Sequence, residues 1–251
     1  MLLHFGLFPS HDLAGQCIAI GFNSGENNQD ALAIAVGGNS GKTDQSEGAI
    51  AVGNNAGNTK QGIHSIAIGV GAGFSQQDDN SVAIGLNAGS LNQDGNCIAI
   101  GSLAAETNQD PDAIAIGNTA GQASQGQNSV AIGTLAGQIG QGQESIAIGD
   151  QAGKTSQGSQ SIAMGHQSGE TGQANEAIAI GHQAGKSTQL SNSVCLGHQA
   201  GFSGLGTNSI GIGHKASFTG GSHDSTIVLN ATGLALNPQG TDRTYIKPRR
   251  S

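Results

Sequence analysis

The stretch Ser145-Ile146-Ala147-Ile148-Gly149 decides the fold, because close copies of it return every sixteen residues. Thirteen copies end on a glycine, from Gly21 to Gly213, with no insertion or deletion between them. A fixed period of this length is typical of a solenoid, in which the apolar side of each repeat is covered only by its neighbours. We therefore expect residues 16–221 to form about 13 sixteen-residue coils.

The apolar positions of each repeat predict a short β-strand just before the glycine. Ile or Val stands three residues before every one of the thirteen glycines, and Ile, Val, Leu or Met stands one residue before it. The residue between them is Ala in eleven copies. Because side chains alternate along a strand, the large residues share one face and the small residues the other. A strand that is apolar on both faces needs two covers: the interior of its own coil and, we infer, identical chains in an oligomer.

A column of glutamines is the second regular feature of the repeat. Gln fills the same position in eleven consecutive copies, from Gln29 to Gln189. Neighbouring coils of a parallel solenoid lie about 4.8 Å apart. These side chains are therefore expected to stack and to bond amide to amide. The predicted fold class is all-β, a parallel β-roll solenoid.

Composition excludes several classes of protein. The chain has 43 Gly, no Trp, one Tyr and 10% charged residues, so a conventional core of large side chains cannot be built from it. A formal net charge of −8 argues against nucleic acid as a partner, and no stretch is apolar enough to predict membrane insertion. The sequence has no nucleophile elbow and no phosphate-binding loop before a helix, so we expect neither an enzyme nor a cofactor.

The two ends depart from the repeat. Residues 1–15 hold several apolar side chains interrupted by His4, Gly6 and Pro9, and we expect them to form an N-terminal cap over the first coil. Near the other end, the apolar run within Ser225–Gly233 is shifted by one residue from the expected phase. Residues 222–251 are therefore predicted to form a terminal capping module.

The run Asn128-Ser129-Val130-Ala131-Ile132-Gly133 resembles the head repeats of the YadA-type trimeric adhesins, and the resemblance extends over residues 16–217. It implies a left-handed parallel β-roll wound as a homotrimer, which acts as a non-enzymatic surface fibre and adheres to a host-surface or matrix receptor. Similar arrays occur in fibres of bacteriophages and large DNA viruses. Because the 225–233 segment is similar to the closing segment of large-virus fibres, a virion or particle-surface fibre is favoured over a bacterial adhesin. The expected location is extracellular or on a virion surface.

Four histidines form the first candidate site. His166, His182, His198 and His214 follow the corner glycine in four consecutive coils, which predicts a column of imidazoles about 4.8 Å apart. Such a column fits a transition-metal site or a pH sensor. Earlier coils carry Asp150, Thr134, Asn118 and Ser102 at this position, which favours a tolerant, solvated turn.

Three aspartates form the second candidate site. Asp78, Asp94 and Asp110 follow the glutamine in three consecutive coils, so that like charges stack. Either solvent screens them or a cation such as calcium lies between them. Because the calcium-binding nonapeptide pattern is missing, screening is the simpler interpretation. The three cysteines, Cys17, Cys97 and Cys195, are interpreted as small buried fillers.

Two other functions compete with the fibre. A regular solenoid also suits binding to ice or to a polymer lattice, although such surfaces usually present long threonine ladders and the variable columns here change identity every few coils. A hexapeptide-type acyltransferase is less favoured, because its coils contain eighteen residues and it carries a histidine on an extruded loop.

Overall fold

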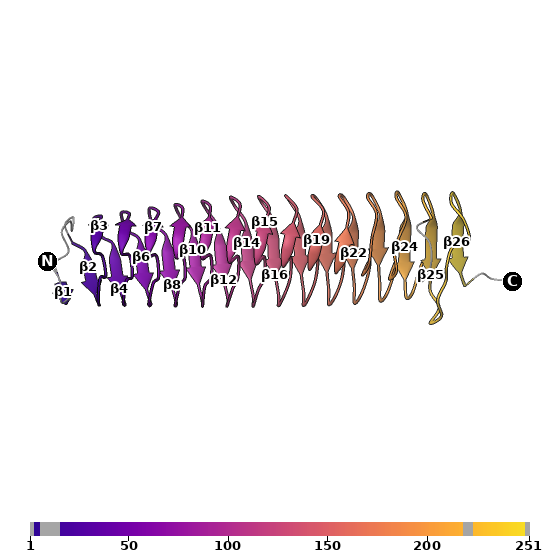
Figure 1. Cartoon of the computed structure of the whole chain (residues 1–251). Helices are drawn as coiled ribbons and strands as arrows, with labels where there is room; N and C mark the ends of the chain where they lie inside the picture. Colours follow the sequence, from indigo (N-terminus) through magenta and orange to yellow (C-terminus); the bar gives the residue numbers. More distant parts are fainter. Residues whose placement is uncertain (1–2, 6–15, 218–222, 249–251) are drawn as a thin grey trace. The chain divides into compact units, whose positions relative to one another are not determined.

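A computed structural model describes residues 3–5, 16–217 and 223–248 of the chain, which divides into two compact units, Met1–Asn128 and Ser129–Ser251. Each unit is a parallel β-solenoid built from strands of three or four residues (Figure 1). The described residues contain no helix, and so none that is long and apolar enough to cross a membrane. The all-β parallel solenoid predicted from the repeat is thereby confirmed.

The N-terminal unit contains two parallel sheets. The first, here called the aliphatic sheet, has the order β1-β2-β4-β6-β8-β10-β12-β14, and the second, the glutamine sheet, runs from β3 to β15 through the odd-numbered strands. The strands of the aliphatic sheet are β1 Leu3–Phe5, β2 Ile18–Ile20, β4 Ile34–Val36, β6 Ile50–Val52, β8 Ile66–Ile68, β10 Val82–Ile84, β12 Ile98–Ile100 and β14 Ile114–Ile116. Those of the glutamine sheet are β3 Asn27–Gln29, β5 Thr43–Gln45, β7 Thr59–Gln61, β9 Ser75–Gln77, β11 Leu91–Gln93, β13 Thr107–Gln109 and β15 Ala123–Gln125.

The C-terminal unit repeats this plan. Its aliphatic sheet comprises β16 Val130–Ile132, β18 Ile146–Ile148, β20 Ile162–Met164, β22 Ile178–Ile180, β23 Val194–Leu196, β24 Ile210–Gly213, β25 Ile227–Asn230 and β26 Thr244–Lys247. Its glutamine sheet comprises β17 Ile139–Gln141, β19 Thr155–Gln157 and β21 Thr171–Gln173. Beyond β21, single bridging pairs continue that ladder, such as Gln189 with Leu205.

The strand register follows the sequence period. Within each unit, over the strands from β2 to β24, residues of the aliphatic sheet pair with the residue sixteen positions further on, for example Val82 with Ile98 and Ala83 with Ala99. The first strand, β1, pairs with β2 at a step of fifteen residues, Leu3 with Ile18. Near the C-terminus the step becomes seventeen residues, since Ile210 pairs with Ile227 and Ile227 with Thr244. The one-residue shift seen in the sequence therefore corresponds to coils that are one residue longer after Ile210. As a result β25 and β26 extend the same sheet.

The interior of each coil is built from small and amide side chains. The central alanines of the aliphatic strands are fully buried, whereas the Ile and Val on either side of them point out of the coil and are only half-buried. Opposite the alanines lie the glutamines, which are also buried. Gln61 Nε2 donates to the carbonyl oxygen of Ile50 at 2.8 Å and to Gln77 Oε1 at 3.2 Å. These bonds satisfy buried amides that would otherwise be costly.

The same bond links successive glutamines throughout the N-terminal unit, from Gln29 to Gln125. In the C-terminal unit it links Gln157 to Gln173 and Gln173 to Gln189. The predicted amide stack is confirmed for these glutamines, and we call it the inner glutamine ladder. The bond is missing between Gln141 and Gln157, whose Oε1 has no hydrogen-bond partner. The ladder ends where Leu205 takes the place of a glutamine. There Leu205, Cys195, Val228 and Leu236 form an apolar plug against which Tyr245 packs.

The corner glycines allow the coils to approach one another closely. Gly53 has φ of 134°, which side-chain-bearing residues rarely adopt. A Cβ at this position would lie 2.5 Å from the carbonyl oxygen of Gly69, the corner of the next coil. Successive corners therefore lie one above another within each unit, as the repeat predicts.

The two ends of the chain are described in part. Residues 3–5 of the predicted N-terminal cap form β1, which pairs in parallel with β2; the other residues of that cap lie outside the described ranges. The boundary predicted near residue 221 also lies outside them. Within the predicted terminal module, residues 223–248 carry β25 and β26.

Candidate functional site

The aliphatic face is a continuous apolar surface in each unit. We use this name for the outward side chains that flank the buried alanines of the aliphatic sheets. In the N-terminal unit seven successive strands, β2 to β14, each contribute two Ile or Val side chains and no polar one. Their exposed fractions reach 38% at Ile68 and 36% at Ile100. The face of the C-terminal unit is of the same kind, with 38% at Met164 and 41% at Leu196.

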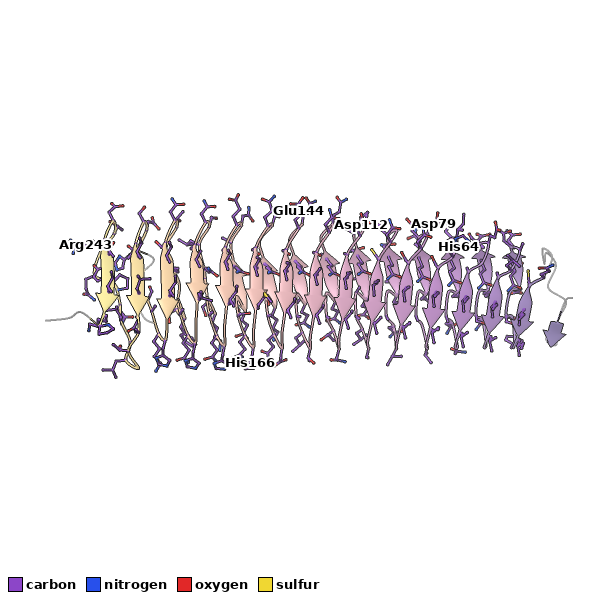
Figure 2. All side chains as sticks on the ribbon, turned by 180° about the vertical axis from the view of Figure 1, so that it is seen from behind. His64, Asp79, Asp112, Glu144, His166 and Arg243 are labelled. Carbon is purple, nitrogen blue, oxygen red and sulfur yellow. The ribbon has the colours of Figure 1, made fainter. Side chains whose placement is uncertain are left out.

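The imidazole column, His166, His182, His198 and His214, lies within the C-terminal unit at the corner that follows each aliphatic strand. Successive rings stack with centroids 5.2, 5.0 and 4.9 Å apart and with planes within 12° of parallel. Figure 2 shows His166 at the edge of the coil opposite to Glu144. The first three rings are exposed and the fourth is half-buried. The predicted column is therefore present and faces solvent.

The charges around this column come from neighbouring coils. At its N-terminal end, Asp150 Oδ2 lies 3.2 Å from His166 Nε2. The pKa of His182 is lowered, first by partial desolvation and then by the charges on His198 and His166, with a smaller effect of Lys186. The neighbouring imidazoles thus oppose each other's protonation, as like charges in a stack must.

A second row of glutamines runs beside the imidazoles and was not recognised from the sequence. Gln151, Gln167, Gln183 and Gln199 each follow the column residue, and each adopts a left-handed backbone conformation with φ between 54° and 57°. Gln183 Nε2 donates to Gln167 Oε1, and Gln199 Nε2 donates to Gln183 Oε1, both at 2.8 Å. The recurrence of Gln at this phase was the signal in the sequence. We call this the outer glutamine row.

The metal hypothesis for the histidines needs a different arrangement of the rings. A metal ion lies in the plane of each imidazole that binds it, and the stacked planes here are nearly parallel, so their lone pairs do not converge on one point. Among the described residues no group of three or more His, Cys, Asp or Glu side chains is placed to hold a metal ion.

The aspartate column lies within the N-terminal unit, at the turn that follows each glutamine strand. Its members are Asp78, Asp94 and Asp110. The pKa of Asp94 is raised by burial and then by the charges of Asp78 and Asp110, so the three carboxylates do interact. Figure 2 shows Asp79 and Asp112, which follow this column, along the same edge as His64. Calcium binding there stays a hypothesis, for which the described geometry supplies no further support.

The three cysteines are buried and form no disulfide, in agreement with their interpretation as fillers. Cys97 Sγ also donates to the carbonyl oxygen of Asp110 at 3.0 Å, in the position where Ser81 Oγ donates to Asp94 at 2.7 Å in the preceding coil. Cys195 replaces one of the buried alanines. All three serve packing and local hydrogen bonding.

No model of a known protein family matches this chain, and no match is found among curated proteins or among solved structures. The class that the geometry defines is a repeat protein with the parallel β-solenoid fold. Any narrower description has to be argued from the surfaces just described.

Proposed function

We propose that this chain is a structural and adhesive surface fibre, without catalytic activity, that assembles with copies of itself through the aliphatic face. The observation that carries the proposal is the composition of that face: fourteen Ile and Val side chains in the N-terminal unit alone, half-buried or exposed. Monomeric proteins rarely expose contiguous apolar surface of this extent. Parallel sheets are normally covered on both faces.

The spacing of the face favours another copy of this chain as its cover. The aliphatic side chains recur once per coil in register over seven strands, as in the pairs Ile50 with Ile66 and Val82 with Ile98. A partner can fill the gaps along such a surface only if its own apolar groups recur at the same spacing. An identical solenoid meets that condition over its whole length. The number of chains, three, is taken from the resemblance to trimeric adhesin heads.

The adhesive part of the proposal is supported by the corner positions. The residue after the corner glycine points into solvent and varies freely along the chain, with Phe22, Val70 and Leu86 exposed in the N-terminal unit and the imidazole column in the C-terminal unit. A rigid framework that presents variable side chains on its turns is the usual arrangement of a recognition surface. The partner proposed for it is a host-surface or matrix receptor, and the proposed location is extracellular or on a virion surface.

The assembly is tested by measuring the mass of the chain in solution by light scattering. A value near three chains is expected at micromolar concentration. Ile66→Asp places a charge in the aliphatic face and should release smaller species, because a carboxylate cannot be buried there without a partner. Ile63→Asp is the matched control, since Ile63 is 42% exposed on a turn outside that face. A folded single-chain species of the unaltered protein would refute the proposal.

Adhesion is tested separately, by measuring binding of the labelled fibre to host cells and to an array of glycans and matrix proteins at neutral pH. Saturable binding to one class of surface is expected. Thermal hysteresis in freezing solution, without such binding, would favour the ice-binding alternative instead.

A further inference from the structure

We propose that the imidazole column is an acid-activated binding strip for a sulfated polysaccharide. The inference rests on the proposed adhesive function, because it names one receptor class and the condition under which it is bound. It starts from the ring stack in the C-terminal unit, in which four imidazoles repeat at about one coil spacing along one edge.

The geometry suits a linear ligand. Three of the four rings are exposed, and His166 stands at the opposite edge of the coil from Glu144 (Figure 2). The rings are held in a straight row because their corner glycines stack; a Cβ on Gly165 would lie 2.8 Å from the carbonyl oxygen of Gly181. Charged groups on such a row match a chain whose anionic groups also repeat along its length, rather than a compact ion.

The charges near the column make it strongly cationic once the imidazoles are protonated. Lys186 acts electrostatically on His182, Lys215 follows His214 directly in the chain, and the carboxylates near the column are Asp150 and Glu170. Glu170 is paired with Lys186 at 3.4 Å and Asp150 with His166. At the C-terminal end the backbone oxygen of His214 accepts a hydrogen bond from Asn230, a neutral residue. Protonation of the four imidazoles therefore adds positive charge to this edge, where Asp150 offsets the charge of His166 and Glu170 offsets that of Lys186, in a chain of net charge −8.

Proton uptake and polyanion binding are coupled in this arrangement. Rings stacked 4.9 to 5.2 Å apart repel one another when charged, and the pKa of His182 is lowered partly for this reason. A polyanion along the row removes the repulsion, so its binding raises the affinity of the column for protons. By linkage, lowering the pH raises the affinity for the polyanion to the same extent. The strip thus binds the polyanion weakly while the imidazoles are neutral and tightly once they are protonated.

The chemistry of the strip favours sulfate esters on a sugar backbone. Sulfate keeps its charge at the pH where imidazoles are protonated, whereas carboxylates begin to protonate a little below it. Beside the rings, the outer glutamine row presents amides with one N–H already bonded to the next side chain, as in Gln199 to Gln183. At Gln183 the second N–H and the second lone pair of the amide oxygen are left for hydroxyl groups, whereas Gln167 Oε1 already accepts from both Gln183 and Lys186.

The test measures binding of the full chain to immobilised heparin at about pH 5 and about pH 8, with neutral dextran as the blank. Binding at the lower pH should be at least about tenfold tighter. The double variant His182→Asn with His198→Asn should lose most of that difference. Asn is compatible with the fold there, since Asn54 and Asn118 occupy the same position in other coils. His64→Asn is the matched control, because His64 is exposed on the turn that follows the glutamine strand β7 in the N-terminal unit, and its replacement should leave the difference intact.

A measurement on the unaltered chain keeps the test independent of how the variants fold. Histidine resonances titrated by NMR should show the pKa of the column imidazoles rising when heparin is added, while that of His64 stays unchanged. Equal binding at both pH values, an undiminished pH effect in the double variant, or a preference for anionic vesicles or single-stranded DNA over heparin would each overturn the proposal. These outcomes do not bear on the solution mass or on host-cell binding at neutral pH, which test the fibre itself.

Discussion

Replacing one amide of the inner glutamine ladder tests whether the interior is held by hydrogen bonds. Gln93 is fully buried; its Nε2 donates to the carbonyl oxygen of Val82 and to Gln109 Oε1, and its Oε1 accepts from Gln77 Nε2, all at 3.0 Å. Gln93→Leu has nearly the same volume but removes all three bonds. It also leaves Gln109 Oε1 without that donor in a dry interior.

The expected loss follows from these contacts. An orphaned buried acceptor costs about 1–3 kcal/mol, and each of the two other lost bonds costs about 0.5–1.5 kcal/mol. We therefore expect Gln93→Leu to lower the free energy of unfolding by roughly 2–6 kcal/mol, measured by denaturant titration monitored by circular dichroism. Gln143→Leu is the control, because Gln143 is exposed on a turn and its replacement should change stability by less than about 0.5 kcal/mol. Equal stability of the two variants would refute the reasoning, since the ladder would then act only as filling.

Three further predictions concern the corners, the aspartates and the thiols. Gly53→Ala should destabilise the fold by about 3 kcal/mol or more, because its Cβ would meet the carbonyl of the next corner at a φ of 134°; Gly95→Ala, whose nearest contact is 3.6 Å away, should be tolerated, and thermal unfolding compares them. Asp94→Asn should stabilise the chain by up to about 1 kcal/mol in urea unfolding at neutral pH. The pKa of this carboxyl is raised in the folded state, so the gain exists above that pKa and should vanish as the pH falls through it; a gain that persists in acid would contradict the assignment. Burial raises the pKa of Cys97 to about 11 and that of Cys195 to about 12, so iodoacetamide should label neither thiol at about pH 8 until the chain is unfolded.

The repeat made much of this structure predictable. A strict sixteen-residue period predicts the strands, their register and the stacked corners, because no other arrangement keeps thirteen copies equivalent. The inner glutamine ladder follows for the same reason: one Gln per coil at fixed phase must meet the next, as Gln61 meets Gln77.

The orientation of the strands was harder to predict. Both faces are apolar, so the pattern alone does not say whether Ala67 or its neighbours Ile66 and Ile68 enter the coil. The structure resolves this through volume: the buried amide of Gln77, bonded to the oxygen of Ile66, occupies the space that a larger inward side chain would need. The sequence showed a phase shift of one residue after Ile210. It did not show that β25 would still pair with β24 in the same sheet, with a coil of seventeen residues. At the candidate site, the imidazole stack was predictable, whereas the pairing of Asp150 with His166 depends on rotamers that a period does not specify.

The inner glutamine ladder also has a consequence for how such a chain can change in length. Among the glutamines, each side chain bonds only to those one coil away, and always in the same direction: Gln45 Oε1 accepts from Gln29, and Gln45 Nε2 donates to Gln61. If a complete coil inside the N-terminal unit were removed or duplicated, the glutamines on either side of the change would still form the same hydrogen bond with each other. Unequal recombination within the gene can therefore shorten or extend the protein in whole coils while the remaining contacts stay as they were.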